Sequence, residues 1–330
     1  AALDNLTTTI VMVALLRKLI SDKGTRWFYA SIIVIAANAG GAWSPIGDVT
    51  TIMLWIGGQV TTVAIMTRVF LPSLVSMVVP LTILSFILKG EVKRPEINSS
   101  DKEFTTSRER IFILILGIGL LINVPVFKTL THLPPYIGML FGLGVLWLTS
   151  EIMHRGKDDE IRRKLTIFHV VKKVDTPTIF FFLGILVAVA ALQSAGQLGL
   201  LANFLDEKLG NIYLINIAIG ALSAIVDNVP LVAGAMGMYP IISPESLQVA
   251  ADPEYMKFFM QDGLFWEFLA YCAGTGGSML IIGSAAGVAA MGLERIDFIW
   301  YMKKISWLAV IGYISGAAAY WLQAQIWVTH

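Results

Sequence analysis

The sequence predicts an all-α polytopic membrane protein with an inverted-repeat fold, re-entrant hairpins and interrupted transmembrane helices. Of its 330 residues, 56% are hydrophobic and only 14% are charged, whereas soluble domains carry about 25% charged residues. Long apolar stretches follow one another along the chain, and a pair of short motifs recurs in the same order in its two halves. A chain with so few charges cannot cover itself with a hydrated surface, and its 17 Phe, 9 Tyr and 9 Trp exclude a disordered chain.

The apolar stretches predict the helices in order, since a membrane-spanning helix needs about 20 mostly apolar residues. They run at 27–58, 66–88, 111–127, 134–150, 177–194, 211–239, 264–293 and 300–328. Residues 198–209 predict a short amphipathic helix at the membrane interface. The spacings Gly138-x-x-x-Gly142 and Gly312-x-x-x-Gly316 favour close approach of neighbouring helices.

The charges predict the topology. Four loops hold 20 of the 24 Lys and Arg residues, at 17–26, 89–110, 151–175 and 294–304, and we expect these loops to face the cytoplasm. The stretch 240–267 has the opposite bias and is expected outside; its acidic residues are Glu245, Asp252, Glu254, Asp262 and Glu267. For that stretch to remain outside, 211–239 must enter and leave on one side, so it is predicted to be a re-entrant hairpin.

Two short patterns recur and indicate an internal repeat. Asp4-Asn5 matches Asp227-Asn228, and the glycine-rich NAGGAWSPIGD at 38–48 matches GTGGSMLIIGS at 274–284. The two glycine breaks lie in spans of opposite direction, a pattern typical of secondary transporters with interrupted helices. The domains are therefore predicted as the rear part of an N-terminal repeat (1–89), a cytoplasmic linker (90–110) and a complete C-terminal inverted repeat (111–330).

Three acidic residues lie within apolar sequence: Asp4, Asp48 and Asp227. A carboxylate in the centre of a span costs about 2.5–3.5 kcal/mol on insertion scales, so a functional role is expected. The alternative is that each carboxylate caps a helix. For Asp4 and Asp227 both roles can hold, and for Asp48 the two are equally favoured.

Small polar side chains surround these aspartates in the sequence. Amides, hydroxyls and bared backbone carbonyls are hard oxygen donors, suited to a small hard cation. Some of the hydroxyls are expected to bond back to their own helix instead. The candidates are Asn5, Thr7, Thr8, Asn38, Ser44, Thr50, Thr51, Ser223, Asn228, Thr275, Ser278 and Ser284.

A carboxylate in such a setting holds either a proton or a metal ion, so exchange of a cation for a proton follows from the competition. No Lys or Arg lies near the glycine breaks in the sequence, which argues against a carboxylate substrate. The four histidines are not spaced as in known metal-binding motifs, and no cofactor is expected. A net charge of +1 provides no electrostatic attraction for nucleic acid. The lone Cys272 permits no internal disulfide.

The motifs DNLTTTIVM, NAGGAWSPIGDVTTIMLWIGGQV, DNVPLVAGAMGMY and GTGGSMLIIGSAAGVAAMG resemble those of the NhaD-type sodium:proton antiporters of the ion transporter superfamily. The resemblance covers essentially the whole chain, and it implies two re-entrant hairpins with Asp-Asn at their tips beside two interrupted helices. It also implies further helices before residue 1. By motif match, the residues lining the ion pathway would be Asp4, Asn5, Asn38, Asp48, Thr50, Thr51, Ser223, Asp227 and Asn228.

The sequence therefore predicts a secondary transporter that exchanges sodium or lithium for protons by alternating access, and not an enzyme. Asp227 and Asp4 are expected to be the principal cation and proton sites, with Asn5 and Asn228 as further sodium ligands. The expected partners are the lipid bilayer and the transported ions; homodimerisation is left open, and the expected location is a bacterial inner membrane. The alternatives are an organic-anion or oxyanion transporter of the same superfamily and, more remotely, an intramembrane protease.

Overall fold

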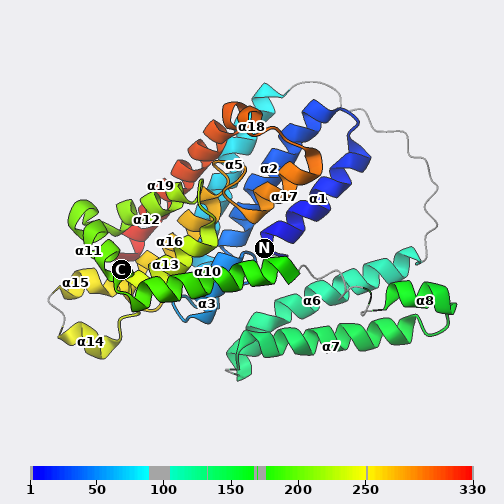
Figure 1. The fold of residues 1–330 in the computed structure, drawn as a ribbon, viewed down its shortest axis with the longest axis horizontal. Helices are drawn as coiled ribbons and strands as arrows, with labels where there is room; N and C mark the ends of the chain where they lie inside the picture. The colour runs from blue at the N-terminus through cyan, green and yellow to red at the C-terminus, as the bar shows by residue number, and fades with distance from the viewer. Residues whose placement is uncertain are drawn as a thin grey trace. The chain divides into compact units, whose positions relative to one another are not determined.

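The computed structural model describes residues 3–88, 105–131, 133–166, 169, 176–249 and 252–328, and every regular element among them is a helix (Figure 1). This confirms the all-α class. From the N-terminus to the long basic linker the helices are α1 (Asn5–Leu19), α2 (Lys23–Ala42), α3 (Val49–Ile56), α4 (Thr62–Arg68) and α5 (Phe70–Ile87). The next are α6 (Ser107–Thr131), α7 (Pro135–Met153), α8 (Asp159–Leu165), α10 (Thr176–Ser194) and α11 (Gln197–Leu209). The last are α12 (Ile212–Leu222), α13 (Asn228–Met238), α14 (Pro244–Gln248), α15 (Pro253–Met256), the 3-10 helix η1 (Lys257–Phe259), α16 (Leu264–Gly276), α17 (Ala285–Glu294), α18 (Phe298–Lys304) and α19 (Ser306–Val328).

Long apolar helices support a polytopic membrane protein. Among the described residues, three stretches are long and apolar enough to cross a bilayer: Thr62–Ile87, Ser107–Thr131 and Pro135–Met153. Two bent pairs raise the number to five if each pair is one span; they bend by 76° between α10 and α11 and by 52° between α18 and α19. The stretch 300–328, expected as one span, is therefore bent near Ile305.

The chain divides into two compact units, one of Leu3–Glu96 with Ile185–His330 and one of Ile97–Gly184. In the second unit α6 packs against α7. Gly138 faces the ring of Phe127 and Gly142 faces Leu120, where a Cβ atom would lie 3.1 and 3.4 Å from the nearest side-chain atom. The first Gly-x-x-x-Gly spacing thus lets two helices approach closely, as predicted.

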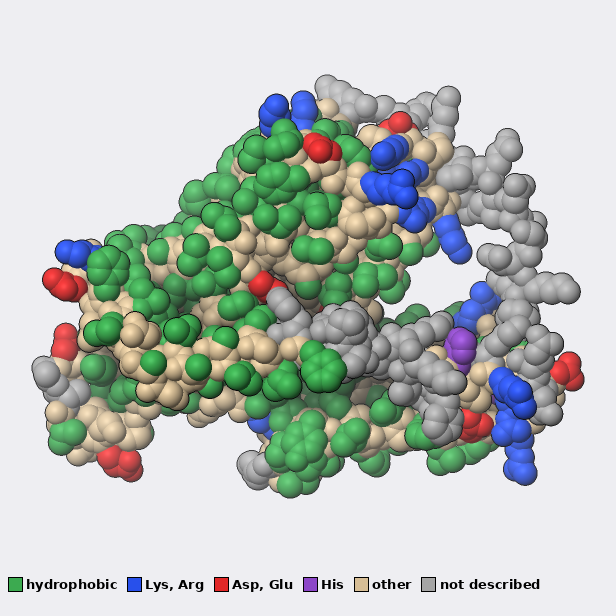
Figure 2. Space-filling model, viewed as in Figure 1, with side chains coloured by type: hydrophobic (Ala, Val, Ile, Leu, Met, Phe, Trp, Pro, Cys, Tyr) green, Lys and Arg blue, Asp and Glu red, His purple; other side chains and the backbone are tan. Residues whose placement is uncertain are grey.

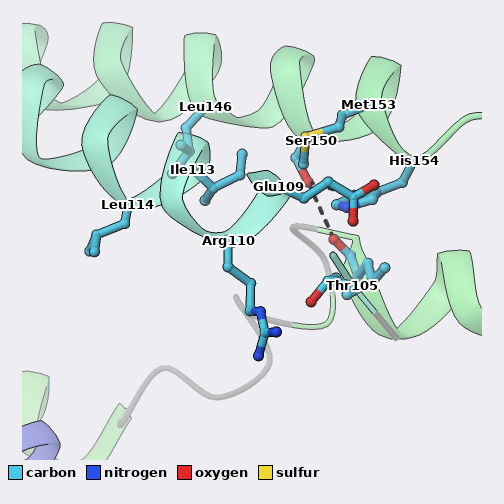
Figure 3. Close-up of a pocket in the computed structure, with 10 residues that line it drawn as sticks. Thr105, Glu109, Arg110, Ile113, Leu114, Leu146, Ser150, Met153 and His154 are labelled. Carbon is cyan, nitrogen blue, oxygen red and sulfur yellow. Dashed lines mark hydrogen bonds between the residues drawn. The ribbon is translucent and has the colours of Figure 1, made fainter. Parts of the chain in front are cut away.

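One end of the α6–α7 pair carries a pocket of about 420 Å³ (Figure 3). Glu109 on α6 and His154 after α7 lie at its wall, and Glu109 pairs with Lys157 at 2.8 Å. The start of α6 and the end of α7 therefore lie together, as expected for two antiparallel spans flanked by the basic stretches 89–110 and 151–175. Most of the predicted linker, residues 90–104, lies outside the described residues, and the division into 1–89, 90–110 and 111–330 stays a prediction.

In the first unit, α5 and α19 pack side by side. A Cβ atom at Gly312 would lie 2.4 Å from the carbonyl oxygen of Ser76, and one at Gly316 would lie 2.5 Å from that of Pro72. Only glycine allows this approach, which confirms the packing role expected of the second Gly-x-x-x-Gly spacing.

Each of the three stretches predicted to be interrupted or re-entrant consists of two helices separated by a break. The stretch 27–58 forms α2 and α3, 264–293 forms α16 and α17, and 211–239 forms α12 and α13. A helix of 11 residues, such as α12 or α13, is about 16 Å long, roughly half the hydrocarbon thickness. The predicted amphipathic helix at 198–209 is also present, as α11.

Basic side chains mark one end of the first unit. Lys and Arg side chains gather where α1, α2 and α18 end or begin (Figure 2); they are Arg17, Lys18, Lys23, Arg26, Lys303 and Lys304. The predicted cytoplasmic stretches 17–26 and 294–304 thus meet, because Arg17 and Arg26 both bind Glu294. The acidic stretch 240–267 is not entirely a loop: α16 begins at Leu264, and Glu267 is fully buried within it.

Candidate cation site

The two glycine breaks have the same local geometry. Asp48 caps α3 by accepting the backbone N–H of Thr50 at 2.9 Å, and Ser284 caps α17 by accepting that of Gly287 at 3.2 Å. A Cβ atom on Gly41 would lie 2.5 Å from the carbonyl oxygen of Gly47, and one on Gly277 would lie 2.6 Å from that of Gly283. Each break therefore needs glycine at the matching position, which gives the sequence repeat a structural counterpart.

The two Asp-Asn dipeptides also share a conformation. Asp4 caps α1 and Asp227 caps α13, so the following asparagine begins a helix in each case. The carboxylate of Asp4 accepts the backbone N–H of Thr7 at 3.0 Å and its hydroxyl at 2.6 Å. That of Asp227 accepts the N–H of Val229 at 3.2 Å. Both aspartates are only half-buried.

Each dipeptide segment touches the break in its own half of the chain. The backbone N–H of Asn5 donates to the carbonyl of Gly47 at 3.0 Å. In the second half, a Cβ atom on Gly283 would lie 2.5 Å from the carbonyl oxygen of Ser223. In both halves, therefore, the glycine break packs against the backbone at or just before the start of the helix that carries the dipeptide.

A chain of buried amides connects the two halves. Asn5 donates through Nδ2 to Oδ1 of Asn38 at 3.0 Å. Asn38 in turn donates through its own Nδ2 to the hydroxyls of Ser278 and Ser284, at 2.9 Å each. Both asparagines are at most 6% exposed, so the first broken span is bonded to the second by groups that water does not reach.

Asp48 is the most buried of the three aspartates, at 1% exposed. Its Oδ1 accepts the N–H and the hydroxyl of Thr50, both at 2.9 Å. Its Oδ2 accepts the amide of Asn5 at 2.7 Å and that of Asn228 at 3.5 Å. Asp48 is therefore both a helix cap and a meeting point of the two Asp-Asn segments. The capping role expected for it is confirmed, and its role in ion binding stays a prediction.

The amides that bind Asp48 leave their oxygens pointing elsewhere. Because Asn5 and Asn228 turn their Nδ2 groups to Asp48, their Oδ1 atoms face away from that carboxylate. A carboxylate that accepts an amide N–H in this way fixes which way the amide oxygen can point.

Three of the candidate hydroxyls bond to backbone carbonyls instead. Thr275 donates to the carbonyl of Tyr271 at 2.6 Å, one turn back in its own helix. Ser223 donates to the carbonyl of Ala273 at 3.2 Å. Thr51 lies 3.4 Å from that of Gly41. These three therefore stabilise the helices around the site, while Ser278 and Ser284 belong to the amide chain.

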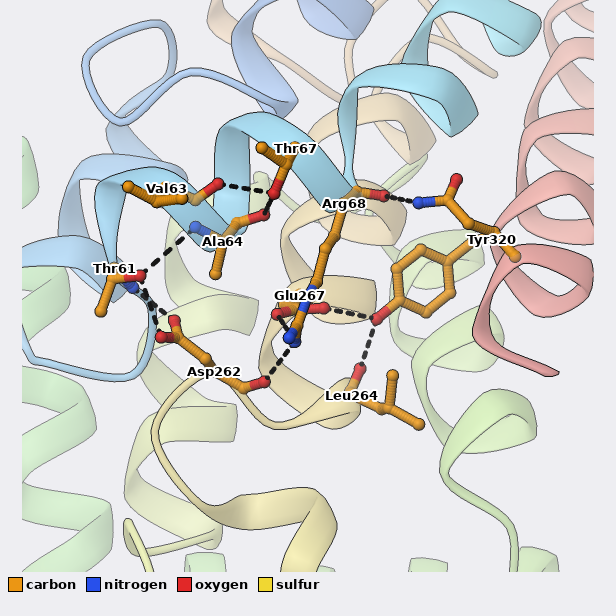
Figure 4. Close-up of polar contacts among 10 residues, drawn as sticks. Thr61, Val63, Ala64, Thr67, Arg68, Asp262, Leu264, Glu267 and Tyr320 are labelled. Carbon is orange, nitrogen blue, oxygen red and sulfur yellow. Dashed lines mark hydrogen bonds and ion pairs between the residues drawn. The ribbon is translucent and has the colours of Figure 1, made fainter. Parts of the chain in front are cut away.

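Buried glutamates were missed by sequence reasoning. Glu267 lies 2.7 Å from Arg68 and accepts the hydroxyl of Tyr320 at 3.0 Å (Figure 4). Glu294, at the end of α17, is 3% exposed and pairs with two arginines. Glu267 lies inside the apolar stretch 264–293, and this position could have indicated from sequence that it is buried in a helix. It conflicts with the assignment of Glu267 to an outer loop.

No group of three or more His, Cys, Asp or Glu side chains that could hold a metal ion occurs in the part of the chain that the structure describes. The oxygen atoms that could bind a cation here belong instead to the buried carboxylate of Asp48, to amides and to hydroxyls. This set matches the hard oxygen ligands that the sequence predicts for a small cation.

Comparison with known proteins finds a matching family and several relatives. Residues 1–258 match the citrate transporter family, CitMHS. The chain is 50% identical over 321 residues to "Sodium/proton antiporter 1" of Arabidopsis thaliana, covering 96% of this chain and 52% of that protein. It is 45% identical over 324 residues to "Sodium/proton antiporter 2" of the same plant, covering 97% and 73%. It is 33% identical over 351 residues to "Na(+)/H(+) antiporter NhaD" of Alkalimonas amylolytica, covering 98% and 67%.

The chain spans about half the length of the first of these relatives. All three are named as antiporters and none as an enzyme. The expected resemblance to NhaD is therefore confirmed, and the described helices agree with a multi-pass membrane protein. The chain belongs to the citrate transporter family, CitMHS, and the NhaD sodium/proton antiporters are among its relatives.

Proposed function

We propose that the chain forms the ion-binding core of a transporter that exchanges sodium or lithium for protons by alternating access. The observation that carries the proposal is the convergence of Asn5 and Asn228, from the two Asp-Asn segments, on one oxygen of Asp48. The names of the relatives support sodium and protons as the transported ions.

In this proposal Asp48 is the fixed element of the site. Four donors already bind its two oxygens, so its role is to orient the amides. Asp4 and Asp227 are half-buried and are the carboxylates at which cation and proton compete. Both lie close enough to Asp48 to interact with it electrostatically.

The competition has a simple electrostatic basis. Three carboxylates near one another repel when all are ionised, and a bound cation or a proton relieves the repulsion. A cation that enters therefore favours loss of a proton, and a proton that enters favours release of the cation. Asn5 and Asn228 supply neutral oxygens that favour the cation without adding negative charge.

The test is sodium-induced proton release from inside-out vesicles that carry the full-length protein, followed with a pH-sensitive dye. Sodium or lithium should collapse an imposed proton gradient, and vesicles with Asp227→Asn protein should not respond. Absence of a response to either ion at every pH between about 6 and 9 would exclude the exchange.

A second candidate function is transport of citrate or another organic anion, because the matching family is described as a citrate transporter. The contacts of Asp48, Asn5 and Asn38 among the described residues come from amides and hydroxyls, and none comes from Lys or Arg. A carboxylate substrate would meet an acidic site there. Uptake of labelled citrate into the same vesicles decides between the two functions.

We propose that the membrane is an energised inner membrane, because sodium-for-proton exchange does work only where a proton gradient is maintained. The basic residues at the shared end of α1, α2 and α18 would face the cytoplasm. No cofactor is proposed, and homodimerisation stays an open question that cross-linking in native membranes would test.

A further inference from the structure

The pocket at the end of the α6–α7 pair adjoins a second, more polar cavity. The first has a volume of about 420 Å³ and the second of about 460 Å³, and Thr105 and Glu109 line both. Every lining residue belongs to the second compact unit, Ile97–Gly184. We call the first cavity the apolar lobe, after its lining by Ile113, Leu114, Leu146, Met153 and Leu165. We call the second the polar lobe; it is lined by Thr106, Gly156, Lys157, Asp158 and Ile161.

The two lobes lie at different depths along the helix pair. Leu114 is seven residues after Ser107, where α6 begins, and Leu146 is seven residues before Met153, where α7 ends. At a rise of 1.5 Å per residue, both leucines lie about 10 Å inside the spans. The residues of the polar lobe lie at or beyond the helix ends. Because headgroups lie outside a hydrocarbon core of about 30 Å, the apolar lobe lies at the level of acyl chains and the polar lobe at that of headgroups.

A buried polar atom without a partner lies beside the apolar lobe. His154, the C-cap of α7, is 6% exposed and lines this lobe. Its Nδ1 lies 3.4 Å from Oγ of Ser150, whereas its Nε2 is buried and has no hydrogen-bond partner in the part of the chain that the structure describes. Figure 3 shows Ser150 and His154 pointing from α7 towards Glu109 of α6. An unsatisfied buried nitrogen is costly, so it favours a ligand that forms a hydrogen bond here.

The carboxylate shared by the two lobes already has partners. Oε2 of Glu109 accepts the ammonium of Lys157 at 2.8 Å and the backbone N–H of Thr106 at 2.8 Å. Its negative charge is therefore compensated within the wall. The other carboxylate of the polar lobe, Asp158, is exposed to water, which screens its charge. An anionic group can thus approach the wall without facing a buried, unpaired carboxylate.

The polar side chains of the wall are chiefly hydrogen-bond donors. They include the hydroxyl of Thr105, the guanidinium of Arg110, the ammonium of Lys157 and the imidazole of His154. A phosphodiester presents only acceptor oxygens and one negative charge, and such donors bind it with charge-assisted hydrogen bonds. The apolar lobe needs hydrocarbon as well. The two lobes together therefore fit a molecule with a phosphodiester joined to an acyl chain.

We propose that the two lobes form a binding site for one phospholipid. An acyl chain occupies the apolar lobe, and the phosphodiester lies at the polar lobe beside His154. The flanking basic stretches 89–110 and 151–175 are expected at the cytoplasmic face, where basic pockets between spans bind anionic lipid headgroups. All candidate residues of the cation site lie in the other compact unit, so the proposal goes beyond the proposed exchange and does not depend on it.

The experiment uses the full-length protein, purified in detergent and stripped of lipid. The probe is phosphatidylglycerol with a photoreactive diazirine in one acyl chain, and mass spectrometry locates the cross-linked residues. Cross-links should fall on the walls of the apolar lobe, at residues 113–114 and 146. Unlabelled phosphatidylglycerol should protect these residues. Diacylglycerol with the same chains lacks the phosphate and glycerol 3-phosphate lacks the chains, so each should protect about tenfold less well.

Two variants change the site in different ways. Leu146→Trp fills the apolar lobe, and His154→Ala removes the imidazole beside it. Each should weaken binding of the probe by about tenfold, and the second keeps the test valid if the first does not fold. The matched control is Leu148→Trp on the same helix; Leu148 is 63% exposed and does not line the pocket. This control should be labelled like the wild-type protein.

The proposal is overturned if cross-links fall elsewhere on the chain, or if Leu146→Trp and His154→Ala are labelled like the wild-type protein. Equal protection by diacylglycerol would overturn the role of the phosphodiester. Equal protection by glycerol 3-phosphate would identify a site for a free phosphate ester and overturn the role of the acyl chain. Labelling needs no sodium, so loss of the proposed exchange and loss of this site are measured separately.

Discussion

Asn5 donates a hydrogen bond of 2.7 Å to Asp48, so the first residue of α1 is bonded to the cap of α3 across a separation of 43 residues. Both side chains are buried, at 6% and 1% exposed. This bond fixes an Asp-Asn segment against a helix break, and the weaker contact from Asn228 at 3.5 Å brings the second segment to the same oxygen. The predictions below test this arrangement.

Replacing Asn5 with alanine should destabilise the protein. The change removes a donor from buried Asp48 and a partner from Asn38, and an unsatisfied buried polar group costs about 1–3 kcal/mol. Thermal unfolding in detergent measures the loss. Asn228→Ala is the matched comparison and should cost less, since its bond is longer; an equal or larger loss would contradict the assigned geometry.

Replacing Asp227 with asparagine should abolish sodium-for-proton exchange and leave the protein folded. Asparagine can still cap α13, but it no longer carries the charge at which cation and proton compete. Sodium affinity should fall at least about tenfold, the size of a lost interaction worth ~1.4 kcal/mol. Unchanged sodium affinity in a folded variant would remove Asp227 from the site.

The glycines at the breaks should not tolerate alanine. A Cβ atom at Gly41 would approach the carbonyl oxygen of Gly47 to 2.5 Å, so backbone must shift. Gly41→Ala should lower both the melting temperature and sodium affinity. Gly234→Ala in α13 is the control, because its Cβ would meet nothing within 4 Å; it should be neutral or gain up to about 1 kcal/mol from helix propensity. A melting temperature unchanged by Gly41→Ala would contradict the close approach.

Asp22 gives a pH prediction. The backbone N–H of Thr25 donates to this cap of α2 and lowers the pKa of its carboxyl, and the hydroxyl of Thr25 and the charge of Arg26 act in the same direction. Because the folded pKa lies below the unfolded one, the stabilisation is complete above the ordinary pKa of aspartate and is lost as pH falls below it. Asp22→Asn keeps the cap and should remove this pH dependence of the melting temperature; an unchanged dependence would contradict the role of Asp22.

The sequence was informative wherever a residue type has one dominant reason to be present. The apolar stretches predicted the helices, and the spacing of glycines predicted the breaks and the close contacts of α19. The two Asp-Asn pairs predicted a repeated segment, and each pair begins a helix. Asn38, Ser278 and Ser284 were all candidates from sequence, and the structure brings the three together.

Other features depend on which side chains meet across the fold. The sequence favoured Asp4 and Asp227 as principal sites, and nothing in it indicated that Asp48 would be the most buried aspartate and bind both asparagines. Glu267 looked like a loop residue because acidic residues precede it, although its arginine and tyrosine partners, 199 and 53 residues away, satisfy its burial within α16. Long-range pairing of this kind leaves no local pattern.

The most direct test of the account is whether sodium binding releases a proton from the purified full-length protein. Calorimetric titration with sodium in buffers of different ionisation enthalpy measures the number of protons released per ion. The account predicts proton release that accompanies sodium binding and disappears in the Asp227→Asn protein. Sodium binding with no proton release, and with an affinity independent of pH, would contradict it.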